Sequence, residues 1–330
     1  MTILTPDNFQ LSSLTNVGDG GQEHHIAINC NPTELPHEVL NFIRGSRADN
    51  TRRAYASDLK HFMAWGGTIP ASQEELASYL AAQAEHLAPA TLNRRLASIA
   101  VAHGAKGFQS PTLSQIVHSV MRGIRRSKST AQVQAKPLLL PDLFMTLDAI
   151  GNGNKDTRDR ALLLLGFAGG FRRSELVGLD VGDLEFVRHG LVINLRYSKS
   201  DQEGQGRKIG IPYGRTKHCP VKAIETWLQR AEISGGPMLR PINRHGHTAS
   251  QRLSGEAVAV VVRDRLAKAG FNPKGYSGHS LRSGFATSAA MAGVATWRIR
   301  KQTGHASDVM LARYVRDGQL FEDNAAGALL

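Results

Sequence analysis

The chain has 330 residues, 41% of them hydrophobic, and its 40 Lys and Arg against 28 Asp and Glu give a formal charge of +12 and an isoelectric point near 10. Such a chain can bury two domain cores, and its excess positive charge favours a polyanionic partner. Short apolar runs, the lack of a signal-peptide pattern and only two cysteines, Cys30 and Cys219, exclude a membrane span, a disulfide framework and a clustered zinc site, so we expect a cytoplasmic protein without membrane contact.

Residues 1–32 carry no periodic apolar pattern, and we interpret them as a flexible N-terminal arm. Residues 33–126 follow a helical period with no strand pattern, which predicts an all-helical bundle of four or five members. The expected helices run from a cap at Asn50 to Trp65, from the capping box of Ser72 and Glu75 to about His86, from Pro89 to His103, and over 114–126.

The basic residues of this bundle occur largely as doublets, with few acidic neighbours four residues away to pair with them. Several such doublets together favour a surface that contacts the phosphate backbone of DNA, and an ordinary solvated helix face is the alternative. The candidate DNA-binding residues are Arg52, Arg53, Lys60, Arg94, Arg95, Arg122, Arg125, Arg126 and Lys128.

Residues 127–137 lack an apolar period and end in proline, which is typical of an extended linker. Helices are then expected over 141–150, 158–169 and 171–179, followed by short strands over 184–187, 191–197 and 207–212. The pattern is helical again from Val221 onward. The sequence therefore predicts a second domain, 138–316, that is mainly α with a small antiparallel β-sheet, followed by a tail over 317–330.

Near the end of the second domain, Gly304 and His305 precede Tyr314 by about nine positions. We expect Gly304 to end one helix and Ser307 to cap the next, over 308–316. Tyr314 would then lie nearly two turns after the cap, so its hydroxyl and the His305 ring can approach one site. A packing tyrosine with its hydroxyl at the surface is the alternative.

His279 and Arg282 have the spacing H-x-x-R, with His279 expected just before a helix and Arg282 in its first turn. An imidazole, a guanidinium and exposed amide groups would then surround one anion-sized position. A capping histidine beside a solvated arginine is the alternative.

Arg172 aligns with Leu176 and Leu179 on the expected helix 171–179, which would place its guanidinium on the core-facing stripe. Such burial is costly unless the charge is paired, and Glu175 can orient it. A purely structural Arg–Glu pair is the alternative. Lys199 ends the expected second strand beside a polar, glycine-bearing loop, from which it can reach a phosphate or simply be an exposed hairpin lysine.

Two arginines, two histidines, a lysine and a tyrosine, without paired carboxylates or metal-ligand spacing, suit attack on a phosphodiester with no metal and no other cofactor. The tyrosine hydroxyl has an ordinary pKa near 10, so it needs a proton acceptor and nearby cations. Fixed guanidiniums stabilise charge on the nonbridging oxygens, and a lysine of depressed pKa suits protonation of the leaving oxygen.

This ordered set resembles the tyrosine recombinase (phage integrase) family, and the match covers roughly residues 35–330. The R-x-x-E-L box begins at Arg172, the strand lysine is Lys199, the H-x-x-R motif begins at His279, and the G-H pair and its tyrosine complete the set. The layout and the tail resemble the Cre-like branch, which often has tryptophan where this chain has His305.

The resemblance implies a helical core-binding domain and a catalytic domain that clamp opposite faces of double-stranded DNA. It implies that Tyr314 forms a 3′-phosphotyrosyl link and releases a 5′-hydroxyl. The residues matching the family's motifs would be Arg172, Arg282 and His305 for phosphate stabilisation, Lys199 as general acid and His279 for proton transfer.

The resemblance further implies that four protomers act on two sites, that religation needs no ATP, and that the tail 317–330 docks on a neighbouring protomer. We expect an inverted-repeat target, and whether accessory DNA-bending proteins take part stays open. The alternatives are a catalytically silent DNA-binding protein on the same scaffold, a type IB topoisomerase or telomere resolvase, and a histidine-zinc nuclease.

Overall fold

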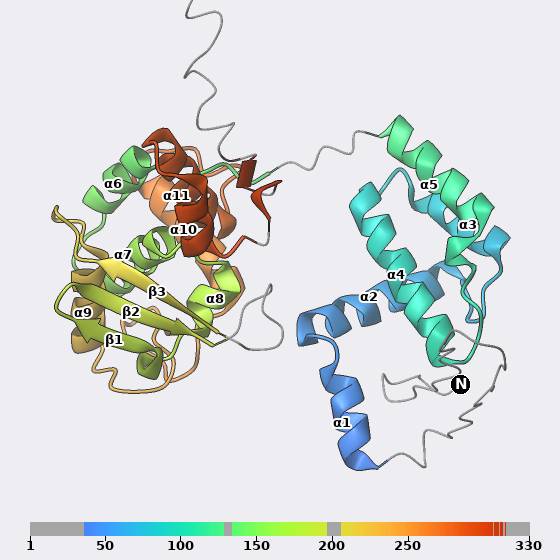
Figure 1. The fold of residues 1–330 in the computed structure, drawn as a ribbon, viewed down its shortest axis with the longest axis horizontal. Coiled ribbons are helices and arrows are strands. Elements are labelled where there is room, and N and C mark those ends of the chain that lie inside the picture. The colour runs from blue at the N-terminus through green and yellow to red at the C-terminus, as the bar shows by residue number, and fades with distance from the viewer. Residues whose placement is uncertain are drawn as a thin grey trace, which may run out of the picture. The chain divides into compact units, whose positions relative to one another are not determined.

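The computed structural model describes residues 36–128, 134–196 and 206–305, together with 307–309, 311, 312 and 314. The chain forms two compact units, Met1–Gln132 and Val133–Leu330, each with its own hydrophobic core (Figure 1). No helix in the described ranges is long and apolar enough to cross a membrane.

The described part of the first unit is built of helices, as predicted. These are α1 (His37–Gly45), α2 (Asp49–Trp65), α3 (Gln73–Gln83), α4 (Pro89–Ala105), the short 3-10 helix η2 (Pro111–Leu113) and α5 (Gln115–Ser127). Their apolar faces meet in one core that includes Phe62, Tyr79, Leu92 and Met121. The core holds α2 against α4 and α3 against α5.

The starts of these helices follow the expected caps at two of three places. The Ser72 side chain accepts the N–H of Glu75 at the start of α3, and Pro89 is the first residue of α4. The cap expected at Asn50 is wrong, because α2 begins at Asp49 and its N-cap is Ala48, two residues earlier. Asn50 lies inside the first turn, where its side-chain oxygen accepts a hydrogen bond from Arg53.

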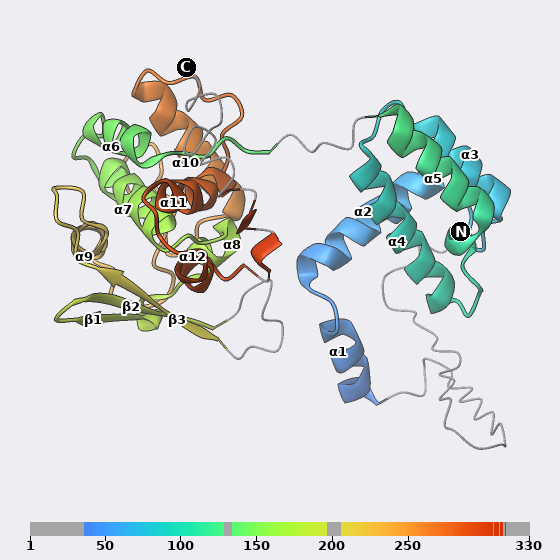
Figure 2. The ribbon, with the colours of Figure 1, turned by 45° about the horizontal axis from the view of Figure 1, so that its top comes forward.

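The described part of the second unit is mainly helical with one small sheet, which confirms the predicted fold class (Figures 1 and 2). The helices before the sheet are α6 (Leu140–Asp148), α7 (Asn154–Ala168), α8 (Arg173–Gly178) and η3 (Val181–Asp183). The strands are β1 (Leu184–Val187), β2 (Gly190–Leu195) and β3 (Arg207–Pro212). The helices after it are α9 (Pro220–Arg230), α10 (Gly255–Lys268), α11 (His279–Met291) and α12 (Thr296–Thr303).

The three strands pair antiparallel in the order β1-β2-β3, which is the predicted meander. Alternate side chains of β2 and β3, such as Leu191, Ile193, Ile209 and Ile211, are buried in the core shared with α7 and α9. The strands were predicted from their β-rich composition and the polar segments between them, and this alternation of buried residues is typical of a sheet that covers a core on one face.

The start of α11 is fixed by the segment that enters the second unit. The backbone N–H of Leu138 donates to the carbonyl of Ser280, and that of Lys136 donates to the carbonyl of Gly275. Gly284 faces this segment so closely that an added Cβ would lie 1.9 Å from the Leu138 carbonyl oxygen. The absence of a side chain at residue 284 therefore lets α11 pack directly on the entering chain.

Candidate active site

Arg172 and Glu175 form a closed pair at the start of α8. Nη1 of Arg172 donates to Oε1 of Glu175 at 2.6 Å, and the backbone N–H of Arg172 donates to Oε2 at 2.9 Å. The carboxylate is buried, and the Arg172 side chain is 19% exposed. The pairing expected from the sequence is present, and it leaves the guanidinium fixed beside the rest of the site.

The expected reason for the burial of Arg172 was wrong. The helix predicted over 171–179 begins only at Arg173, and Arg172 precedes it with extended backbone angles. Arg172 therefore does not share a helical stripe with Leu176 and Leu179. Glu175 reaches back to the Arg172 N–H, and this capping contact sets the first residue of the helix.

Arg282 is the most deeply buried cation of the site, with 1% of its surface exposed. It lies in the first turn of α11, and Nη1 donates to the carbonyl of Gly170 at 2.8 Å and to that of Thr303. Burial, together with the charge of Arg172, lowers the pKa of Arg282 to about 10. The guanidinium thus keeps its charge at neutral pH.

Arg207, the first residue of β3, joins this cluster and was missed by the sequence analysis. Its Nη1 donates to the carbonyls of Gln302 at 2.9 Å and Lys301 at 3.3 Å, and its Nη2 donates to that of Thr303 at 3.2 Å. Nη2 also lies 3.7 Å from Oε2 of Glu175. Burial lowers the pKa of Arg207. The available signal was an arginine that opens a buried strand.

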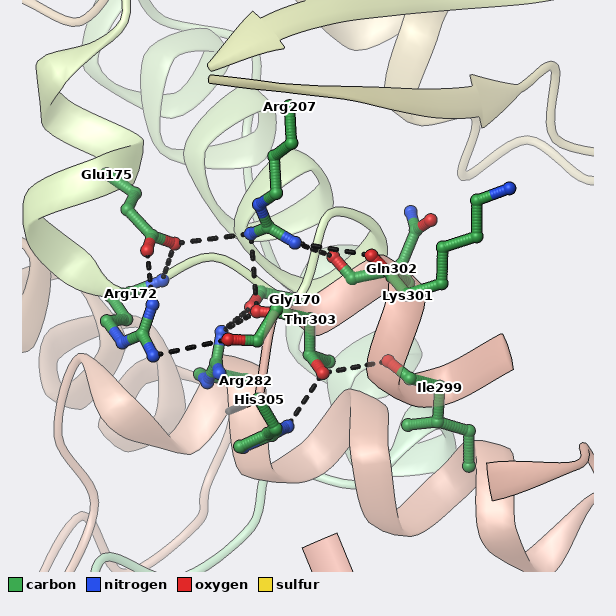
Figure 3. A network of polar contacts seen from close by, with 11 residues as sticks. Gly170, Arg172, Glu175, Arg207, Arg282, Ile299, Lys301, Gln302, Thr303 and His305 are labelled. Atoms are coloured by element: carbon green, nitrogen blue, oxygen red, sulfur yellow. Dashed lines mark hydrogen bonds and ion pairs between the residues drawn. The ribbon is translucent and has the colours of Figure 1, made fainter. Parts of the chain in front are cut away.

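Three guanidiniums therefore meet at the C-terminal end of α12 (Figure 3). Arg207 and Arg282 hold the Thr303 carbonyl, and Nη2 of Arg172 approaches that of Gly304 at 3.4 Å. The negative end of the helix dipole favours cations at this position. Three cations against the one Glu175 carboxylate leave an excess of positive charge, which makes the cluster suitable for an anion.

Gly304 ends α12 in the left-handed conformation, with φ +67°, as its position in the sequence predicted. An added Cβ would lie 2.7 Å from Cζ of Arg207. A side chain at residue 304 would therefore meet both an unfavourable backbone angle and the nearby guanidinium, which would have to move.

Tyr314 and His279 approach each other across this cluster. The hydroxyl of Tyr314 lies 2.8 Å from Nε2 of His279, and the Tyr314 and His305 ring centroids are 5.6 Å apart. The Tyr314 ring also packs on a small apolar cluster that includes Ile299 and Leu311. His279 is the first residue of α11, one position later in the helix than expected from the sequence.

His305 is 5% exposed and lies next to the end of α12. Its Nδ1 is 2.7 Å from Oγ1 of Thr303, and that hydroxyl lies 2.8 Å from the carbonyl oxygen of Ile299. Burial, followed by the charges of Arg282 and Arg172, lowers the pKa of His305 to about 3. The ring is therefore neutral over the whole physiological range.

Five of the six residues expected to act together thus meet in one place: Arg172, His279, Arg282, His305 and Tyr314. His279 and Arg282 share α11, and the other three come from separate segments. The sixth, Lys199, lies outside the described residues, as do the arm 1–32 and the tail 317–330. Residues 308, 309, 311, 312 and 314 are helical, as expected for the segment 308–316.

The basic residues of the first unit divide into two groups. Arg94 binds Asp58 through two hydrogen bonds of 2.8 and 2.9 Å, and Arg125 binds Asn93 at 2.8 Å. Arg52 and Arg53 each bind a side chain three residues earlier in α2. The second group consists of three exposed residues and one half-buried residue. The exposed ones are Lys60, Arg122 and Arg126, and the half-buried one is Lys128.

Arg95 differs from its expected role as a surface contact. The residue is only 8% exposed, and Nη1 donates to the Tyr79 hydroxyl at 2.7 Å and lies 2.6 Å from Nδ1 of His61. Its Nε is 3.6 Å from the buried carboxylate of Asp58. Arg95 therefore belongs to a polar network inside the helical unit, where it cannot reach a phosphate at the surface.

The arrangement in the second unit offers a nucleophile, a proton acceptor and fixed cations around one position. Tyr314 and His279 are within hydrogen-bond reach, and Arg172 and Arg282 supply charge where an oxyanion would develop. In the described part of the chain, no three His, Cys, Asp or Glu side chains are grouped to hold a metal ion.

Comparisons with known proteins agree on one family. The model of the phage integrase family matches residues 141–319. An integrase/recombinase XerD homolog of Selenomonas ruminantium is 40% identical over 290 residues, which span 85% of each chain. The Cre recombinase of Escherichia phage P1 is 24% identical over 332 residues, which span 92% of this chain and 94% of Cre. The structure of a lambda integrase tetramer bound to a Holliday junction shares the fold, with TM-score 0.55, 18% identity and coverage of 87% of this chain and 79% of the other.

Proposed function

The chain belongs to the phage integrase family, and on that basis we propose that it is a tyrosine recombinase that breaks and rejoins DNA strands at specific sites. The observation that carries the proposal is the 2.8 Å approach of the Tyr314 hydroxyl to His279, beside the buried guanidinium of Arg282. A purely structural tyrosine would have no need of a hydroxyl turned toward a cationic cluster.

The proposed reaction is transfer of a phosphodiester from a DNA oxygen to Tyr314. The phenolic oxygen attacks phosphorus as its proton passes to Nε2 of His279, and the bond from phosphorus to the 5′-oxygen breaks. The 5′-oxygen takes up a proton, for which Lys199 is the proposed donor. The product is a 3′-phosphotyrosyl link and a free 5′-hydroxyl, so a 5′-hydroxyl of another strand can reverse the step without ATP, metal or other cofactor.

Arg172 and Arg282 are the proposed stabilisers of the charge that collects on the nonbridging oxygens. Both guanidiniums are held by protein groups, Arg172 by Glu175 and Arg282 by the carbonyls of Gly170 and Thr303. Fixed donors of this kind do not have to reorganise as the charge develops, which is why they lower the barrier more than water does. His305 is the third proposed partner of the phosphate.

The DNA substrate is proposed to contact both units. Lys60, Arg122 and Arg126 are exposed on the helical unit, where they can neutralise backbone phosphates, and the cluster around Arg282 holds the scissile phosphate. In this proposal 33–126 is the core-binding domain, 127–137 the linker and 138–316 the catalytic domain.

The proposed active assembly is a homotetramer on two inverted-repeat sites. The lambda integrase structure that shares this fold is a tetramer on a Holliday junction, which supports the assembly without showing it for this chain. The apolar end of the tail 317–330 is proposed to dock on a neighbouring protomer.

The covalent intermediate gives the most direct test. A duplex with a nick near the cleavage site traps the intermediate, because the short fragment carrying the 5′-hydroxyl diffuses away after cleavage. We expect wild-type protein to form a complex with DNA that survives denaturing electrophoresis and EDTA, and Tyr314→Phe to form none while binding DNA with unchanged affinity. Tyr213→Phe, which changes an exposed tyrosine, is the matched control. Equal adduct in the wild type and Tyr314→Phe would refute the nucleophile.

Lys199 has its own test, because its role is proton donation to a leaving oxygen. A substrate with sulfur at the 5′ bridging position leaves as a thiolate, which needs no proton at neutral pH. We expect Lys199→Ala to cleave the ordinary substrate at least about 100-fold more slowly and the sulfur substrate at nearly the wild-type rate. An equal loss on both substrates would remove Lys199 from the acid role.

Exchange between two sites separates a recombinase from a topoisomerase on the same scaffold. We expect strand exchange only when the DNA carries two target sites. Relaxation of any supercoiled plasmid, with no target site, would favour the topoisomerase instead.

A further inference from the structure

Thr303 makes two contacts that together determine where His305 carries its proton. Oγ1 of Thr303 lies 2.8 Å from the carbonyl oxygen of Ile299 and 2.7 Å from Nδ1 of His305 (Figure 3). Thr303 is fully buried and His305 nearly so. Water therefore does not compete for these contacts, and the hydrogen bonds within the protein decide the arrangement.

A threonine hydroxyl has one hydrogen to donate. The carbonyl of Ile299 can only accept, so the hydroxyl donates to it, in the bond that side chains of this type often make to the carbonyl four residues earlier. At the contact with His305 the same oxygen must then accept, and Nδ1 must carry the hydrogen. A neutral ring has only one N–H, which leaves Nε2 as a lone pair.

We propose that Thr303 is a positioning residue that fixes His305 with its proton on Nδ1, so that Nε2 is an acceptor in the free protein and donates to the scissile phosphate only after the ring takes up a second proton. This inference rests on the proposed function, since the phosphate is the one in the strand to be cleaved. It adds to that function a coupling between binding of the phosphate and uptake of the second proton by His305.

The groups that face His305 explain why the second proton is absent before DNA binds. In the described part of the chain the groups include Arg172 ahead of α8, Arg207 on β3, His279 and Arg282 on α11, and the ring of Tyr314. Arg300 on α12 donates to the His305 carbonyl at 3.2 Å and pairs with Asp308 at 3.3 Å. Glu175 offsets part of this charge, because it pairs with Arg172 and lies near Arg207. A bound phosphodiester brings a negative charge to the cluster and favours the imidazolium.

The tautomer can be measured directly in the DNA-free protein by nitrogen-15 NMR of labelled histidine. We expect His305, assigned by the signals lost in His305→Gln, to show a protonated Nδ1 and an unprotonated Nε2 at pH 7. Thr303→Ser keeps the hydroxyl and should keep this pattern, whereas Thr303→Val removes the acceptor and should move proton population to Nε2. A wild-type ring with its proton on Nε2, or no change in Thr303→Val, would overturn the inference.

Cleavage of the nicked duplex in single turnover gives a second readout that a merely structural role would not move. We expect wild type and Thr303→Ser to share one pH profile with an alkaline limb on which His305 loses its second proton. In Thr303→Val the neutral ring can donate from Nε2, so its rate relative to wild type should rise by about tenfold per pH unit along that limb. A constant ratio at every pH would count against the proposal.

The two tests fail in different ways. If the proposed function were wrong, the wild type would form no covalent adduct, yet the tautomer of His305 would still be readable by NMR. If only the positioning role were wrong, the adduct would form and Thr303→Val would be slower by the same factor throughout. Thermal unfolding of both Thr303 variants checks that they fold, and if Thr303→Val does not, the wild-type and Thr303→Ser spectra still decide.

Discussion

The hydroxyl of Tyr314 lies 2.8 Å from Nε2 of His279, so the proposed nucleophile and its proposed proton acceptor are paired within the protein. The two residues come from the start of α11 and from the helical segment after α12. Both elements pack on one apolar cluster that includes Ala286, Ile299 and Leu311. This packing positions the two side chains next to each other.

Removal of the imidazole should therefore slow cleavage without preventing it. We expect His279→Gln to lower the single-turnover cleavage rate by about 10²- to 10³-fold at pH 7, because the phenol then loses its positioned base. Part of the rate should return as the pH rises toward the pKa of the phenol. His245→Gln, at an exposed loop histidine, is the control. An unchanged rate in His279→Gln would exclude proton transfer through this residue.

Arg207 should matter through the backbone that it holds. Arg207→Ala removes donors to three carbonyls at the end of α12, so we expect about a 10- to 100-fold slower cleavage from misplacement of His305 and Tyr314. Arg207→Lys should recover little, because one ammonium cannot match the fork of a guanidinium. Arg215→Ala, at an exposed arginine nearby in the chain, is the control. Equal activity of all three variants would contradict this role.

Gly304→Ala should destabilise the protein for two separable reasons. The backbone has φ +67°, which costs about 1 kcal/mol for alanine, and the new Cβ would also meet the Arg207 guanidinium. Gly293→Ala is a matched control, since Gly293 has φ +71° and open space around it. We expect the larger loss of unfolding free energy in Gly304→Ala, measured by urea denaturation. The excess over Gly293→Ala should shrink when Arg207 is alanine, and an equal loss at both glycines would exclude the clash.

The low pKa of His305 predicts weaker folding in mild acid. Its pKa is 6.5 in the unfolded chain and about 3 in the folded protein, so between these values the unfolded state binds more protons. Stability from this group is complete above pH 6.5 and is lost as the pH falls toward 3. Urea denaturation should show a loss of about 2 kcal/mol between pH 7 and pH 5. His305→Gln should reduce this loss, and an identical pH dependence in the variant would refute the assignment.

The salt dependence of DNA binding should separate surface contacts from buried arginines. We expect Arg122→Ala and Arg126→Ala each to reduce the slope of log affinity against log salt by about 1, because each removes one proposed phosphate contact. Arg95→Met should leave the slope unchanged and lower the unfolding free energy by about 2–4 kcal/mol, because it breaks the contacts with Tyr79 and Asp58. A smaller salt slope in Arg95→Met, with an unchanged unfolding free energy, would indicate instead that Arg95 contacts DNA at the surface.

Sequence patterns that span a few residues predicted the features that depend on contacts between near neighbours in the chain. The β-rich run over 207–212, the capping box at Ser72 and the glycine stop at Gly304 all have causes within a few residues, and the structure shows each of them. The fold class and the family followed from such patterns together with the order of the motifs. The boundary at Arg173 was missed because the capping contact of Glu175 competes with the helical period.

The remaining differences come from contacts between residues far apart in the chain. Arg207 meets residues 301–303, nearly a hundred positions later, and no spacing rule connects the two segments. Arg95 is buried because Asp58, Tyr79 and His61 are brought to it from α2 and α3. The neighbours Arg94 and Arg95 look equivalent in the sequence, although the Arg94 side chain is exposed and that of Arg95 is buried.

The three guanidiniums hold the end of α12 through peptide oxygens, which every amino acid carries. Arg207 binds the backbone carbonyl of Lys301. Substitution of this exposed side chain is therefore expected to leave the hydrogen bond to Arg207 intact. Substitution at residue 301 can therefore change this part of the surface without disturbing the guanidinium cluster beneath it.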